Sequence, residues 1–224
     1  MYKTISILFL AIISFSCTTN QEKGTSVNED AAAQNEESKK EIESEKSIIT
    51  EPISNKASFI ETALQAVPKS KRDSCTVKGY TETGEFVTYK EGTNEIICLA
   101  DDPRKDGFSA ASYHKSLEPF MARGRALKKE GKDGREIFKI REKEIKSGEL
   151  KMGDKGTTLH VYYGPKAVYN PESGAVPSAE HRYVVYLPFE TAESTGLPEM
   201  PMEPNHPWIM DPGTHKAHVM ITPK

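Results

Sequence analysis

Four residues near the C-terminus have side chains that could bind a metal ion: His206, Asp211, His215 and His218 lie within thirteen residues of one another. Imidazole nitrogens and a carboxylate are ligands that zinc accepts. His215 and His218 are three positions apart at the start of an expected strand, where such positions face opposite sides, so a shared ion requires a turn at Gly213. Alternatively, His206 orders the surrounding loop and His218 makes a local hydrogen bond. A metal-dependent hydrolase that uses zinc at this group is one hypothesis for the function.

The cysteines offer a second kind of chemistry. The chain has three, Cys17, Cys75 and Cys98, and the last two are left as a pair if Cys17 is modified. In an oxidising compartment such a pair can form a disulfide. The bridge would close a loop of about 24 residues and stabilise the fold by ~3 kcal/mol. The alternative is two buried free thiols on neighbouring strands.

A basic segment between residues 115 and 139 is a candidate anion site. Arg123 and Arg125 are its best candidates, because a guanidinium binds phosphate or carboxylate through two parallel hydrogen bonds. A phosphate, an anionic glycan or lipopolysaccharide would suit it. Glutamates are interleaved with the basic residues, so a solvated helix face is the alternative.

Trp208 is the only tryptophan, and it lies in a long Pro-rich loop over residues 195–214. Loops of this length in compact domains are often functional. The side chain is either an aromatic platform for a peptide or sugar, or an anchor that holds the loop on the core, which the apolar neighbours favour. The sequence contains no Ser-His-Asp, Gly-rich phosphate-binding or CxxC pattern, and Asp101 with Asp102 indicates a turn.

The elements that position these residues predict a single α+β domain over residues 51–224, with about six strands and three helices. Apolar spacing predicts a helix over 54–67, and alternation predicts strands over 75–80, 85–90 and 96–100. Two helical segments follow, over 109–129, with an alternative start at Ser116 that places Pro119 in the first turn, and from a capping box at Asp133 to Gly148. Further strands are expected over 158–163, 183–187 and 217–221.

The N-terminus has the pattern of a bacterial lipoprotein signal peptide over residues 1–16. Lys3 precedes an apolar run over 5–13 that is too short to span a membrane, and residues 14–17 resemble a lipobox that ends at Cys17. Cys17 is the expected lipidation site, and a lipid anchor makes the membrane a partner. An ordinary secreted protein in which Cys17 is incidental is the alternative. Thr18 after the cysteine favours the outer membrane over the inner one.

Residues 17–50 are expected to form a disordered acidic tether, with eight acidic residues and four lysines over 18–50. The domain over 51–224 then carries 25 acidic and 25 basic residues, a net charge near zero. Such a charge provides no basic field for nucleic acid, which is therefore not an expected partner.

Segments at both ends of the domain resemble a group of uncharacterised secreted bacterial proteins. The resemblance lies in residues 66–68, in 90–94 with Cys98, and in 212–221. It implies an envelope location and a single domain, and it assigns no catalytic residue. The sequence therefore favours a non-enzymatic binding or accessory module, displayed in the envelope to an unknown ligand or protein.

Overall fold

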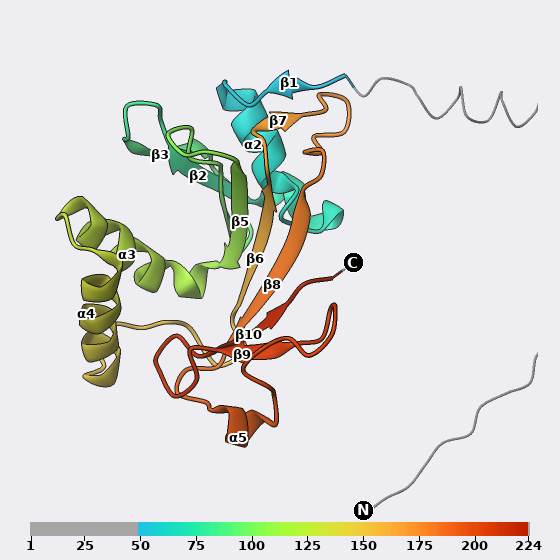
Figure 1. Cartoon of the computed structure of the whole chain (residues 1–224). Helices are drawn as coiled ribbons and strands as arrows, with labels where there is room; N and C mark the ends of the chain where they lie inside the picture. The colour runs from blue at the N-terminus through green and yellow to red at the C-terminus, as the bar shows by residue number, and fades with distance from the viewer. Residues whose placement is uncertain (1–48, 224) are drawn as a thin grey trace, which may run out of the picture. The chain divides into compact units, whose positions relative to one another are not determined.

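The structure is a computed structural model that describes residues 49–223, which belong to one compact unit. The signal peptide, Cys17 and almost all of the tether lie outside the described residues. Helices and a large mixed sheet confirm the α+β class (Figure 1). Within 49–223, no helix combines the length and the apolar character that crossing a membrane requires.

The core of the fold is an eight-stranded sheet in the order β3-β2-β4-β5-β6-β8-β10-β9. Only β2 and β4 run parallel, and every other neighbouring pair is antiparallel. Its strands are β2 (Thr76–Tyr80), β3 (Phe86–Lys90), β4 (Ile96–Leu99), β5 (Phe108–His114), β6 (Thr158–Gly164), β8 (Glu180–Tyr186), β9 (Trp208–Met210) and β10 (His218–Ile221). A separate two-stranded ribbon joins β1 (Glu51–Pro52) to β7 (Val168–Tyr169).

The helices cover opposite faces of this sheet (Figure 1). On one face, α2 (Lys56–Leu64) packs Phe59 and Ala63 into a cluster with Val77 and Cys98. On the other, α3 (Glu118–Lys129) packs Phe120 against Tyr186 and other side chains of that face. The α4 helix (Gly134–Lys146) lies against α3, and a short α5 (Ala192–Thr195) follows β8. The three expected helices are therefore α2, α3 and α4.

The helix expected to start at residue 109 is wrong in its first part, because this segment is strand β5. Phe108, Ala110 and Ser112 face the α2 side, where the Ser112 hydroxyl donates to the Ala66 carbonyl over 2.8 Å. Tyr113 faces the α3 side. The small residues of β5 let the strand lie between two packed layers. Because small residues are weakly hydrophobic, the sequence pattern does not predict a strand here. The alternative is confirmed in placing Pro119 in the first turn, although α3 begins at Glu118 and not at Ser116.

Two other local predictions have clear outcomes. The capping box at Asp133 is confirmed: its side chain accepts from the Glu136 amide, while the Glu136 side chain accepts from the Asp133 amide. The loop over 195–214 is not wholly irregular, because Trp208–Met210 forms the edge strand β9 beside β10. With β5 and β9, the main sheet has two strands more than the six expected.

Candidate ligand-binding site

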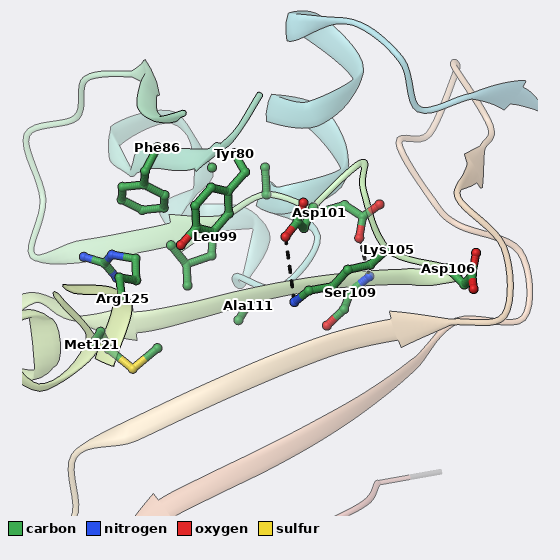
Figure 2. Close-up of a pocket in the computed structure, with 13 residues that line it drawn as sticks. Tyr80, Phe86, Leu99, Asp101, Lys105, Asp106, Ser109, Ala111, Met121 and Arg125 are labelled. Carbon is green, nitrogen blue, oxygen red and sulfur yellow. Dashed lines mark hydrogen bonds and ion pairs between the residues drawn. The ribbon is translucent and has the colours of Figure 1, made fainter. Parts of the chain in front are cut away.

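A cleft of about 250 Å³ lies on the α3 face of the sheet, where the β2–β3 hairpin, the loop after β4 and α3 meet (Figure 2). We call it the aromatic cleft. It is lined by Gly79, Tyr80, Phe86, Leu99, Ala100, Asp101, Asp102, Lys105, Asp106, Ser109, Ala111, Met121 and Arg125. An apolar lining with a few polar groups at its ends is typical of small-ligand sites.

The hairpin register forms the aromatic wall of the cleft. Tyr80 and Phe86 are cross-strand partners at the turn end of β2 and β3, with ring centroids 5.0 Å apart in an edge-to-face arrangement. Such pairs are favourable beyond the area they bury. Leu99 and Ala111, partners on β4 and β5, lie between the ends of the cleft in Figure 2, and Met121 of α3 lies beside Arg125.

One end of the cleft is acidic and comes from the loop after β4. Asp101 is buried and accepts a hydrogen bond from the Ser109 amide over 2.9 Å. Burial raises the pKa of the Asp101 carboxyl, since the charged form loses solvation. The neighbouring Asp102 binds Arg104 through two hydrogen bonds of 2.8 and 2.9 Å, and these hold its pKa below the usual range.

The other end is basic and is set by Arg125, in the second half of α3. The guanidinium of Arg125 lies 4.3 Å from the centre of the Phe86 ring, and its Nη2 donates to Glu118 over 2.7 Å. The same carboxylate accepts from Lys78 over 3.2 Å and from the Tyr113 hydroxyl over 2.5 Å. Arg125 Nη1 is buried with no hydrogen-bond partner among the described residues. Two cations therefore share one carboxylate here.

A second hollow, more open and of about 600 Å³, adjoins this end. We call it the basic hollow. It is lined by Tyr80, Gly84, Glu85, Phe86, Arg104, Arg125, Ala126, Lys128 and Lys129. Tyr80, Phe86 and Arg125 line both spaces.

The residues of the expected metal site are not brought together. His215 is fully buried between helix side chains, with its ring 5.9 Å from Phe120 and 4.6 Å from Phe138. His218 donates from Nδ1 to the Lys216 carbonyl over 2.7 Å, which confirms the local hydrogen bond.

Asp211 pairs with Lys216 over 3.3 Å, and His206 is exposed in the loop. Within residues 49–223, no group of three or more His, Cys, Asp or Glu side chains is arranged to hold a metal. The zinc site is therefore wrong, because aromatic packing occupies His215 and local bonds occupy His218 and Asp211.

The two candidate arginines have different positions. Arg123 is committed to Glu144 of α4, with three N–O distances of 2.6 to 3.0 Å, and lies 3.5 Å from Glu130. It joins α3 to α4. Arg125, two residues on, faces the cleft instead.

Trp208 holds its loop on the core, as the apolar neighbours favoured. Its side chain packs against the cluster on the α3 face from strand β9. It also lines a shallow hollow with Tyr183 and Pro204. Its use as a platform for a peptide or sugar stays a prediction.

Cys75 and Cys98 are buried free thiols beside the parallel β2–β4 pair, and Cys75 Sγ donates to the Lys71 carbonyl over 3.1 Å. The neighbouring Cys98 thiol lowers the pKa of the Cys75 thiol to about 6, and Cys75 together with burial raises the pKa of Cys98. The disulfide stays a prediction. We expect oxidised glutathione to convert the pair into an intramolecular bridge, because the Cys75 thiolate is the attacking form and its partner is in contact.

Intact mass after alkylation in denaturant measures the result. Oxidised protein should take up two fewer alkyl groups than reduced protein at Cys75 and Cys98, and Cys75→Ser should remove the difference. Full alkylation of both thiols after oxidation would contradict the expected bridge.

Sequence patterns alone do not identify most of the residues that line the aromatic cleft. Tyr80, Phe86, Leu99 and Met121 were recognised only as strand or helix residues. The available signal was the alternation of the hairpin, which places Tyr80 and Phe86 on one face.

Comparison with protein-family models, with curated proteins and with solved structures found no match to this chain. The resemblance to secreted bacterial proteins therefore stays an expectation.

Proposed function

We propose that this protein is a non-enzymatic binding module, displayed in the bacterial envelope, that holds a small ligand in the aromatic cleft. The observation that carries the proposal is the cleft itself: an aromatic pair, an apolar floor and opposite charges at its two ends. Burial of the apolar part of a ligand in the cleft is favourable because it removes apolar surface from water. The polar ends of the cleft then fix the orientation of the ligand. The aromatic and apolar side chains Tyr80, Phe86, Leu99, Ala111 and Met121 belong to regular strands and a helix, so this part of the site exists before a ligand binds.

The test is a thermal-shift screen of the purified protein against sugars, short peptides and phosphorylated small molecules. Ligands of the cleft should raise the melting temperature, since binding to the folded state alone stabilises it. Ala111→Leu fills the floor of the cleft and should abolish each shift. Ala57→Leu adds the same side chain at an exposed position of α2 and should leave the shifts unchanged. Shifts that survive Ala111→Leu, or a screen without any shift, would overturn the proposal.

The envelope location rests on the lipobox pattern and Cys17, which lie outside the described residues. We expect Cys17→Ser to move the protein from the membrane fraction to the soluble fraction, because the acyl chains carried on Cys17 would be its membrane anchor. Fractionation followed by immunoblotting measures this, with the unsubstituted protein in parallel. Full retention of the Cys17→Ser protein on the membrane would exclude lipidation as the anchor.

A further inference from the structure

The aromatic cleft and the basic hollow are joined by shared walls. Tyr80, Phe86 and Arg125 line both, so a ligand that fills the cleft and extends past the two rings enters the hollow. Each ring also supports a guanidinium, with Arg104 4.7 Å from the centre of Tyr80 and Arg125 4.3 Å from that of Phe86. The two spaces therefore form one continuous binding surface with a cationic lining at its outer part.

The positive charge of the hollow is only partly balanced. Arg125 and Lys78 share the single carboxylate of Glu118. Lys128 and Lys129 are exposed and form no ion pair within residues 49–223. The one acidic residue that lines the hollow is Glu85. An anion placed here gains charge-assisted hydrogen bonds, which are the stronger kind.

The opposite end of the cleft has the opposite preference. Asp101 and Asp106 line it, with Lys105 as the basic residue among them, while Asp102 also lines it but is paired with Arg104 of the basic hollow. Figure 2 places Asp101 and Asp106 away from Arg125, with the apolar floor between. An anion at the acidic end would be repelled, whereas a hydroxyl or amino group could donate to the carboxylates. Charge alone thus fixes which way an anionic ligand lies.

We infer that the ligand is a ring-bearing organic anion: its apolar ring lies in the aromatic cleft against Tyr80 and Phe86, and its phosphate, sulfate or carboxylate lies in the basic hollow. This inference rests on the proposed function and adds the chemical class of the ligand. It gives Arg125 a binding role that Arg123, two residues away, lacks because Arg123 is committed to Glu144.

The experiment compares four probes by isothermal titration at low ionic strength: 1-naphthyl phosphate, 1-naphthoate, neutral 1-naphthol and inorganic phosphate. The aryl anions should bind about 10-fold more tightly than naphthol, as one hydrogen bond to a charged group provides. Inorganic phosphate should bind weakest because it lacks the ring. The ratio of the affinity for naphthyl phosphate to the affinity for naphthoate distinguishes a phosphate ligand from a carboxylate ligand. Added salt should reduce the advantage of the anions and leave naphthol unchanged.

Two variants locate the effect. Lys128→Gln/Lys129→Gln removes exposed charges from the hollow without touching the fold, and it should reduce the advantage of the anions. Lys139→Gln/Lys143→Gln makes the same change of charge at exposed positions of α4 and should leave it intact. Arg125→Gln should lower the affinity for the aryl anions to that for naphthol, and circular dichroism confirms that the variant is folded.

The outcomes separate this inference from the proposed function. Naphthol binding in the cleft, with no advantage for the anions, would overturn the anionic ligand and leave the binding module standing. An advantage that persists in the Lys128→Gln/Lys129→Gln protein and in Arg125→Gln would also overturn it. If no probe binds at all, the inference fails together with the cleft as a site for aromatic ligands.

Discussion

Replacing Gly92 with alanine is expected to destabilise the domain by about 3 kcal/mol or more, enough to leave much of a marginally stable protein unfolded. An added Cβ would meet backbone atoms of Ser74, Cys75 and Thr76 far inside the 3.0 Å below which real Cβ contacts are essentially not found. Backbone atoms cannot rotate away as a side chain does. The loop is also fixed on this segment, because the Thr93 amide donates to the Ser74 carbonyl over 2.8 Å. Urea denaturation at neutral pH measures the loss.

Gly134 provides the matched control. It is the first residue of α4, an added Cβ meets nothing within 4 Å, and its φ is not in the left-handed region. Gly134→Ala should therefore be neutral or stabilise the fold by up to about 1 kcal/mol. Equal stabilities for Gly92→Ala and Gly134→Ala would show that the loop does not lie against β2 as described.

The second large effect is a loss of stability at low pH caused by His215. Its ring is fully buried, neither nitrogen has a hydrogen-bond partner within residues 49–223, and Phe120 and Phe138 pack against it. Burial, with a smaller contribution from Arg141, lowers the pKa of His215 from 6.5 to about 4. The carboxylate of Glu142 at 3.6 Å opposes the shift without cancelling it, and Lys216 adds to it.

The direction of this pH effect follows from the lowered pKa of His215, which is a base. Above pH 6.5 the ring is neutral in both states, and His215 carries no penalty. Between pH 6.5 and about 4 the unfolded chain binds a proton that the folded chain does not, so stability falls as pH falls, by up to about 3 kcal/mol. His215→Leu should remove this part of the pH dependence, and the difference between wild type and variant isolates it from other groups that titrate.

Denaturation curves from pH 4 to 7.5 provide the measurement. The wild-type protein should lose about 3 kcal/mol more than His215→Leu on going from pH 7.5 to 4. His206→Gln controls for loss of a histidine as such, since that side chain is exposed and makes no hydrogen bond within the described residues. Parallel curves for wild type and His215→Leu would contradict the buried, neutral ring.

Local signals in the sequence predicted the elements well where they were strong. The Asp133 capping box, the stop before Pro68 and the β2–β3 hairpin all depend on neighbouring residues, and each is present. Strand β5 was missed because its central residues, 109–112, are small, and only its place inside the sheet makes it a strand. β9 was hidden for a related reason: three residues among prolines pair only because β10 lies beside them.

The same holds for the candidate site: local sequence patterns identify some of its residues, and tertiary packing determines the rest. Arg125 was identified from its charge, whereas the sequence could not separate it from Arg123, since Glu144 approaches Arg123 only when α4 packs on α3. Histidines near one another in sequence suggested a metal, but His215 packs against the rings of Phe120 and Phe138. The cleft joins residues from four separate segments, so no local pattern contains it.

The measurement that tests the central claim most directly is methyl NMR of the protein labelled with ¹³C at its methionine methyl groups, titrated with 1-naphthol. Met121 lines the cleft, while Met200 and Met202 are 75% and 74% exposed on the distant loop and serve as internal controls. We predict that the Met121 signal shifts in a saturable way and that those of Met200 and Met202 do not. A titration that leaves Met121 unmoved, or that shifts the loop methionines equally, would contradict ligand binding in the aromatic cleft.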